Sequence, residues 1–132
     1  MKETILVVDD NVKNRVVLQR VLTYHGFNVL EAEDGAKGVN MAREYSPSLI
    51  LMDIQMPVMN GLEAGKLLHA DPRTKDIKLL AISSIDKLDD HSLATVFDGY
   101  IETPFNILEL PKIIIKHLQD SECGCQLGRG DF

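Results

Sequence analysis

The sequence predicts an α/β protein in which one parallel sheet carries helices on both faces. Short apolar, β-branched runs alternate with longer stretches whose apolar residues recur at helical spacing. The apolar runs are continuous rather than alternating, which is typical of strands buried on both faces. Alternation of strands and helices favours a parallel sheet with right-handed crossovers. The 132 residues are enough for one domain and leave no room for a second.

The N-terminal part predicts two strands, each followed by a helix. Thr4–Val8 is a continuous apolar run and predicts the first strand. Apolar residues at helical spacing follow it and stop before Gly26, a residue type that commonly comes after a helix. Asn28–Ala32 predicts the second strand. Asp34 can cap the next helix, which should end before Pro47.

The central part continues the alternation. Ser48–Met52 is the clearest strand in the chain. Asn60 and Glu63 form a capping-box-like pair at the start of the next helix, and Pro72 ends that helix. Lys78–Ile82 is another apolar run and predicts the fourth strand.

The C-terminal part predicts a weaker helix at Leu88–Phe97, a very short strand at Gly99–Ile101 and a last helix at Ile107–Leu118. Pro111 fits that helix only in its first turn. Residues 120–132 hold three glycines and no periodicity. We therefore expect a domain over residues 1–119 and a flexible tail over 120–132.

Composition and charge exclude several classes of protein. Apolar residues make up 45% and charged residues 26%, as in ordinary globular proteins. The net charge of −6 disfavours nucleic-acid binding, which needs a basic surface. No apolar run approaches the about 20 residues of a membrane span, and no signal-peptide-like segment is present, so we expect a cytoplasmic protein. Cys123 and Cys125 have no second cysteine pair with which to build a zinc site.

Acidic and hydroxyl residues follow the predicted strands at their carboxyl ends, where ligands bind in such folds. Asp9 and Asp10 follow the first strand, Asp53 follows the third and Ser83 follows the fourth. Two carboxylates about 4 Å apart repel by about 4 kcal/mol at an effective dielectric of 20. Mg²⁺ offsets such repulsion and prefers oxygen ligands. A single aspartate here would more often be a helix cap, but three at one edge favour a metal site.

A carboxylate beside a metal ion can act as a nucleophile toward phosphorus and form an aspartyl phosphate. Phosphoryl transfer needs mainly in-line positioning and charge stabilisation from the protein. Asp53 is the best candidate nucleophile, because it stands alone at the end of a central strand while Asp9 and Asp10 form a ready ligand pair. Ser83 would donate a hydrogen bond to a phosphoryl oxygen.

From about Thr4 to Leu118 the chain resembles the response-regulator receiver domains of two-component signalling. The motifs that carry the resemblance are Val7-Val8-Asp9-Asp10-Asn11, Leu51-Met52-Asp53-Ile54-Gln55-Met56-Pro57 through Asn60-Gly61, Ser83, Asp98-Gly99-Tyr100 and Pro104-Phe105. The resemblance implies a flavodoxin-like fold of five parallel strands in the order 2-1-3-4-5.

The resemblance also implies the chemistry of the site. Asp53 would accept a phosphoryl group from a phosphohistidine of a sensor histidine kinase or a histidine phosphotransfer protein. Asp10, Asp53 and the backbone carbonyl of Gln55 would bind Mg²⁺ directly, and Asp9 would act mainly through water. Ser83 and Tyr100 would form a switch pair that responds to the phosphoryl group.

The same resemblance implies a stand-alone response regulator that signals by protein–protein contact and is not an enzyme beyond its own Mg²⁺-dependent phosphorylation and dephosphorylation. The fourth helix, fifth strand and fifth helix would contact a downstream protein, and the same surface could form a homodimer. No nucleic acid or membrane is implied as a partner.

One position departs from the family pattern. Thr103 stands immediately before Pro104, where the family has a lysine that bonds the phosphoryl group. Two readings follow: a working phosphoacceptor with slower transfer and a damped response, or an interaction module that does not depend on phosphorylation. A metal-dependent phosphatase is a third reading, but it usually needs a second acid where Gln55 stands.

Overall fold

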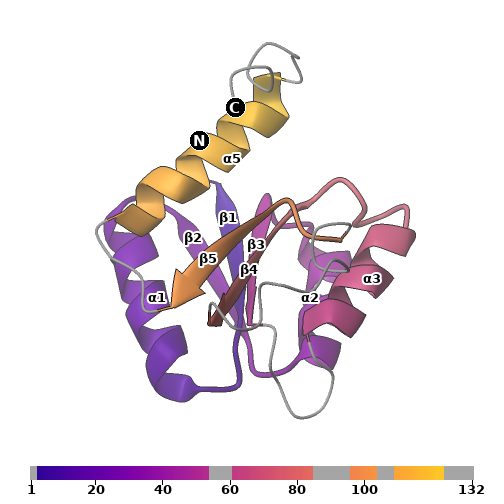
Figure 1. The fold of residues 1–132 in the computed structure, drawn as a ribbon, viewed down its shortest axis with the longest axis horizontal. Helices are drawn as coiled ribbons and strands as arrows, with labels where there is room; N and C mark the ends of the chain where they lie inside the picture. Colours follow the sequence, from indigo (N-terminus) through magenta and orange to yellow (C-terminus); the bar gives the residue numbers. More distant parts are fainter. Residues whose placement is uncertain (1–2, 54–60, 85–95, 104–108, 124–132) are drawn as a thin grey trace.

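The computed structural model describes residues 3–53, 61–84, 96–103 and 109–123. Five strands form one sheet in which every pairing is parallel, in the order β2-β1-β3-β4-β5 (Figure 1). The strands are β1 (Thr4–Val8), β2 (Asn28–Ala32), β3 (Leu49–Asp53), β4 (Lys78–Ser84) and β5 (Gly99–Thr103). The predicted fold class and strand order are confirmed.

Helices cover both faces of this sheet. They are α1 (Val12–Tyr24), α2 (Gly35–Tyr45), α3 (Gly61–Ala70) and α5 (Leu110–Cys123). Figure 1 shows α1 and α5 on one side of the sheet and α2 and α3 on the other. Most of the helix predicted at Leu88–Phe97 lies outside the described residues.

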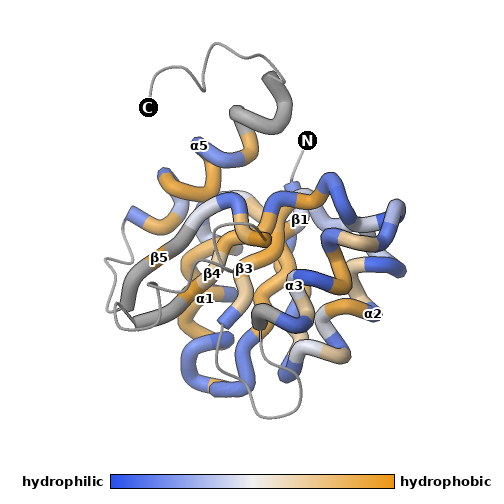
Figure 2. Tube along the Cα trace, turned by 45° about the vertical axis from the view of Figure 1, so that its right-hand side comes forward, coloured by the Kyte–Doolittle hydropathy of each residue, from blue (hydrophilic) through white to orange (hydrophobic). Residues whose placement is uncertain are grey.

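Successive residues of each central strand pack into two different cores. In β1, Leu6 and Val8 pack with residues of α2 and α3, whereas Ile5 and Val7 pack with residues of α1 and α5. Because both faces are buried, the central strands are apolar over most of their length, and Figure 2 shows them as the hydrophobic centre of the molecule. Burial of a Leu, Ile or Val side chain contributes about 1.5–3 kcal/mol. The carboxyl ends of the strands are therefore held on a rigid support.

Local signals set the helix ends as the sequence indicates. The Asp34 side chain accepts a hydrogen bond of 2.8 Å from the Lys37 amide and so caps α2. Ser46 ends the same helix in a left-handed conformation, with φ of 46°. Gly26 follows α1 with φ of 95°, a conformation that favours glycine. None of the helices in the described part of the chain combines the length and apolar character that a membrane span requires.

Several predicted boundaries are wrong by a few residues. β3 begins and ends one residue later than expected, and β4 and β5 each run two residues further, because polar residues at strand ends still pair through the backbone. The predicted start of the last helix was too early, and Pro111 lies in the first turn of α5 as its missing amide requires.

α5 runs five residues further than the helix predicted to end at Leu118 and includes residues 120–123, while the flexible tail stays a prediction. The sequence after Leu118 contains no helix breaker until Gly124, so the helix can continue to Cys123. Residues 124–132 lie outside the described part of the chain.

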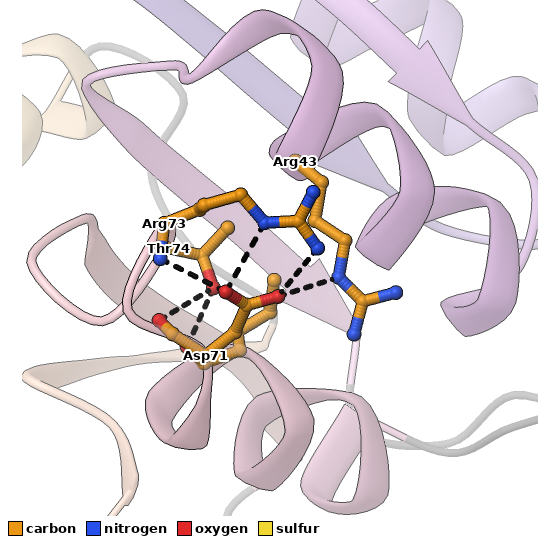
Figure 3. Close-up of polar contacts among 5 residues, drawn as sticks. Arg43, Asp71, Arg73 and Thr74 are labelled. Atoms are coloured by element: carbon orange, nitrogen blue, oxygen red, sulfur yellow. Dashed lines mark hydrogen bonds and ion pairs between the residues drawn. The ribbon is translucent and has the colours of Figure 1, made fainter.

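A charged cluster ties α2 to the segment after α3 (Figure 3). Asp71 Oδ2 accepts hydrogen bonds from Arg43 Nε at 2.8 Å and from Arg73 Nη2 at 3.1 Å. The Thr74 hydroxyl donates to the Leu68 carbonyl at 2.6 Å. The Arg73 side chain, the Arg73 amide and then Arg43 hold the pKa of the Asp71 carboxyl well below its usual range.

Gly38 should be intolerant of a larger side chain. A Cβ at this position would lie 2.8 Å from Val8 Cγ2 in the core. Gly38→Ala gains up to about 1 kcal/mol of helix propensity, but overpacking costs about 1–3 kcal/mol. We expect a net loss of about 1 kcal/mol in the free energy of unfolding in urea. Asn40→Ala, on the exposed side of α2, should cause no loss in the free energy of unfolding. Equal stabilisation by Gly38→Ala and Asn40→Ala would contradict the close approach of Gly38 to Val8.

Asp71→Asn should lower stability at neutral pH. Because the folded-state pKa of Asp71 is depressed, its contribution is present above the unfolded value near 3.8 and is lost as pH falls through the folded value. Urea unfolding from pH 7 to pH 3 should therefore show the gap between wild type and Asp71→Asn narrowing at the acidic end. Asp76 is exposed, so Asp76→Asn makes the same change of charge and should have little effect on stability to urea. A stability difference between wild type and Asp71→Asn that widens as the pH falls would contradict a lowered pKa for Asp71.

Candidate metal site at the carboxyl edge of the sheet

Three carboxylates meet at the carboxyl edge of the sheet. Asp9 and Asp10 follow β1, and Asp53 is the last residue of the neighbouring strand β3. One ligand oxygen from each lies within 4.8 Å of the others. The predicted convergence of the three is confirmed, and its cause is the parallel pairing of β1 with β3.

The separations suit a divalent cation held by oxygen. Opposite ligands of Mg²⁺ at about 2.1 Å lie about 4.2 Å apart. The carboxylate oxygens lie within 4.8 Å of one another, so they need to move together only slightly to bind one ion. Alternatively, one of the carboxylates can bind the ion through a water molecule. The donor set is all carboxylate, which matches the preference of a hard cation.

Asp9 is the buried member, with 2% of its surface exposed. Its Oδ1 accepts a hydrogen bond of 2.9 Å from the Asn11 amide, and its Oδ2 accepts one of 3.4 Å from the Asn14 side chain. Burial raises the pKa of the Asp9 carboxyl, Asp10 raises it further by repulsion, and the bonds from Asn11 and Asn14 oppose the rise. Because both oxygens already have partners, this carboxylate is suited to an indirect role at the ion.

The other two carboxylates are more accessible. Asp10 is exposed and Asp53 is partly buried. Asp53 also lies in the middle of the sheet, where its strand pairs with β1 on one side and with β4 on the other. Asp53 is therefore the central carboxylate of this edge, with Asp10 beside it.

The remaining predicted site residues reach the same edge through β4 and β5. Asp53 pairs with Ile82, so Ser83 is the next residue of β4 beyond that pair. Thr103 ends β5 and pairs with Ser84. The backbones of Ser83 and Thr103 therefore lie at the carboxyl edge with Asp53.

Two further predicted residues are not placed at this edge by the described part of the structure. Tyr100 lies earlier in β5, where it pairs with Ala81. Gln55, the expected carbonyl ligand, lies outside the described residues, and its role stays a prediction.

Three residues at the start of α1 have contacts at the site that were not predicted from the sequence: Asn11, Asn14 and Arg15. Asn11 caps the helix by accepting from the Asn14 amide at 3.2 Å. Arg15 Nη1 donates to the backbone carbonyl of Asp9 at 2.7 Å. An asparagine just before an apolar helix is a recognised capping signal, so Asn11 could have been found; the contact of Arg15 depends on the turn between strand and helix.

Comparison with known proteins agrees with this geometry. The response regulator receiver domain family matches residues 5–115, and the chain belongs to that family. PilH of Pseudomonas aeruginosa is 40% identical over 86 residues, which cover 65% of this chain and 71% of PilH. The polar-differentiation response regulator DivK of Brucella anthropi is 28% identical over 123 residues, covering 92% of this chain and 100% of DivK.

Histidine kinase P4 of Formosa agariphila is 34% identical over 122 residues, which cover 91% of this chain. The chain spans only 9% of the length of that kinase. Receiver domains therefore occur among its relatives both as complete small proteins and as one part of a much larger one.

Solved structures resemble the chain along most of its length. A CheY-like receiver domain protein from Methanospirillum hungatei has a TM-score of 0.86 at 25% identity and covers 95% of this chain and 100% of its own. The receiver domain of a Pseudomonas aeruginosa sensor histidine kinase has a TM-score of 0.83 at 26% identity and covers 90% of this chain and 99% of its own. The latter holds a magnesium ion coordinated in its active-site cleft. The prediction of a receiver domain is confirmed.

Asp9→Asn should stabilise the ion-free protein at neutral pH. Since burial raises the folded-state pKa of Asp9 above its unfolded value, the ionised carboxylate lowers stability at neutral pH, and this loss disappears as acid protonates it. Thermal unfolding in EDTA at pH 7 should show a higher Tm for Asp9→Asn than for wild type, with the difference shrinking toward pH 4. The exposed Asp76→Asn should not reproduce the gain. A lower Tm for Asp9→Asn at pH 7 would contradict this account.

Proposed function

We propose that this receiver domain accepts a phosphoryl group on Asp53 from the phosphohistidine of a sensor histidine kinase or a histidine phosphotransfer protein in the cytoplasm. The main observation that supports this proposal is the cluster of Asp9, Asp10 and Asp53 at one edge of the sheet. The chain also belongs to the receiver family. Mg²⁺ would be held directly by Asp10, Asp53 and the Gln55 carbonyl, with Asp9 acting through water.

The assignment of Asp53 as nucleophile is supported by the different surroundings of the three acids. Asp9 is buried and has hydrogen bonds to both oxygens. Asp10 is exposed, and Asp53 is partly buried between the neighbouring strands. Asp53 therefore has both access to a donor and a fixed position, which in-line transfer needs.

The transfer forms a bond between an Asp53 oxygen and phosphorus while the bond from phosphorus to the donor imidazole breaks. The imidazole nitrogen keeps the electron pair and takes a proton. A Mg²⁺ ion held by Asp10 and Asp53 would stabilise the negative charge of the phosphoryl oxygens and the carboxylates. Water would then attack phosphorus, the bond from phosphorus to the Asp53 oxygen would break, and inorganic phosphate and a proton would leave, which returns Asp53 to its free carboxylate.

Ser83 would donate a hydrogen bond to the phosphoryl group, and the response would pass to Tyr100. This proposal is supported by the strand register, because Ser83 and Tyr100 lie in the paired segments of the neighbouring strands β4 and β5. The output would be protein–protein contact with a downstream target through the surface of the fourth helix, β5 and α5, which could also serve a homodimer. The alignment with DivK, a response regulator, covers all of DivK and 92% of this chain, and this coverage supports a stand-alone role.

Thr103 lies where a lysine would bond the phosphoryl group in the resembling family. A threonine cannot supply that positive charge. We therefore propose slower transfer and a weaker conformational response than a lysine-containing receiver would give.

Incubation with Mg²⁺ and acetyl phosphate should add one phosphoryl mass to the wild-type chain, detected by mass spectrometry. Asp53→Asn should gain none, because the attacking carboxylate is absent, and EDTA should prevent the gain in wild type. Thr103→Lys should raise the rate of uptake, since it restores a cation at the end of β5. No added mass on wild type, or the same mass on Asp53→Asn, would contradict the proposed function and leave a phosphorylation-independent interaction module.

A further inference from the structure

We propose that Arg15 is a positioning residue of the acidic site, and that magnesium affinity depends on its hold on the peptide group between Asp9 and Asp10. This inference rests on the proposed function, because the ion is part of that function. Arg15 touches neither the ion nor the phosphoryl group in this assignment; it acts through the backbone.

The contacts of Arg15 join three elements. Its Nη1 donates a hydrogen bond of 2.7 Å to the Asp9 carbonyl. Its Nε lies 3.4 Å from Glu31 Oε1 on β2, and the Arg15 side chain is 15% exposed against 40% for Glu31. The guanidinium is thus held in a fixed orientation between α1 and β2, and the bond that it makes to the carbonyl is charge-assisted.

The Asp9 carbonyl needs this donor because the sheet ends there. The Asp9 amide still donates to the Ala32 carbonyl at 3.1 Å, but Ala32 is the last residue of β2. Asp9 is 2% exposed, and a buried carbonyl without a partner is costly. Arg15, the fourth residue of α1, supplies the hydrogen bond where the strand ladder no longer can.

This carbonyl belongs to the peptide group that joins two of the three site carboxylates. A peptide group is planar, so fixing its carbonyl oxygen also fixes the direction of the Asp10 amide and restricts the backbone torsions on either side. The Asp9 side chain is held separately by Asn11 and Asn14. Asp10 is exposed, and the backbone that carries it is held through the bond from Arg15.

Charge and positioning predict opposite effects of removing Arg15. A positive side chain beside an acidic site disfavours a divalent cation by Coulomb repulsion, so loss of the charge alone would tighten magnesium binding. Loss of positioning would weaken it, because the carboxylates would have to be ordered when the ion binds. Changes to residues that orient ligands typically cost about 10–100-fold in metal affinity.

The test is calorimetric titration of the full chain with Mg²⁺, comparing Arg15→Gln with Arg20→Gln. Arg20 is exposed on the same helix and gives the same change of net charge. We expect Arg15→Gln to weaken magnesium binding about tenfold or more, and Arg20→Gln to leave it unchanged or slightly tighter. Arg15→Lys, which keeps the charge and one donor, should recover part of the loss.

A readout without the ion separates positioning from loss of stability. In ¹H–¹⁵N spectra of the ion-free proteins, the Asp10 amide should shift in Arg15→Gln and stay in place in Arg20→Gln. Leu22→Val, a buried change in the same helix, should lower stability while keeping wild-type magnesium affinity.

Wild-type affinity or tighter binding in folded Arg15→Gln would overturn the inference. If Arg15→Gln does not fold, the variants Arg15→Lys and Glu31→Gln test the inference in its place. Weaker magnesium binding by both variants supports the inference. Wild-type magnesium affinity in both variants overturns it. Failure of wild type itself to bind Mg²⁺ would instead count against the proposed function. The Asp10 amide shift would still test the hold of Arg15 on the backbone.

Discussion

Repulsion among three carboxylates at one edge of the sheet is the constraint on which the site depends. Parallel pairing of β1 with β3 forces Asp9, Asp10 and Asp53 together, and the buried member has a raised pKa as a result of its surroundings. A protein that keeps such a cluster is less stable without a cation than with one, because ligands that bind only the folded state stabilise it. Binding of a cation at this edge would therefore be coupled to the stability of the fold.

The rest of the fold resists that repulsion. Apolar side chains fill both faces of the sheet, and α2 approaches β1 so closely that Gly38 has no space for a Cβ. At the end of α3, Asp71 joins α2 through Arg43. Neither contact places a positive charge beside the three carboxylates, so the strands are held in place without reducing the negative charge of the site.

The sequence predicts what depends on local pattern, and less of what depends on contacts between distant segments. Continuous apolar strands and strand-end acids were enough to predict the parallel sheet and the meeting of Asp9 with Asp53. The last residues of β5 were missed, because Thr103 enters the strand through its pairing with β4. The roles of Arg15 and Asp71 were missed because they rest on contacts with Glu31 and Arg43, which no sequence spacing indicates.

Under the proposed function, charge balance would make the residue at position 103 important to the site. Three ionised carboxylates carry three negative charges, and one Mg²⁺ supplies two positive charges, so a lysine at position 103 would complete the balance. With threonine there, one negative charge is left before any phosphoryl group arrives. The guanidinium of Arg15 lies beside Asp9 and lowers the pKa of its carboxyl, but this is the smallest of the effects on that group, and Arg15 also pairs with Glu31. A phosphoryl group that brings further negative charge would then depend more heavily on the ion, and occupancy of the ion site would control how readily Asp53 can be modified.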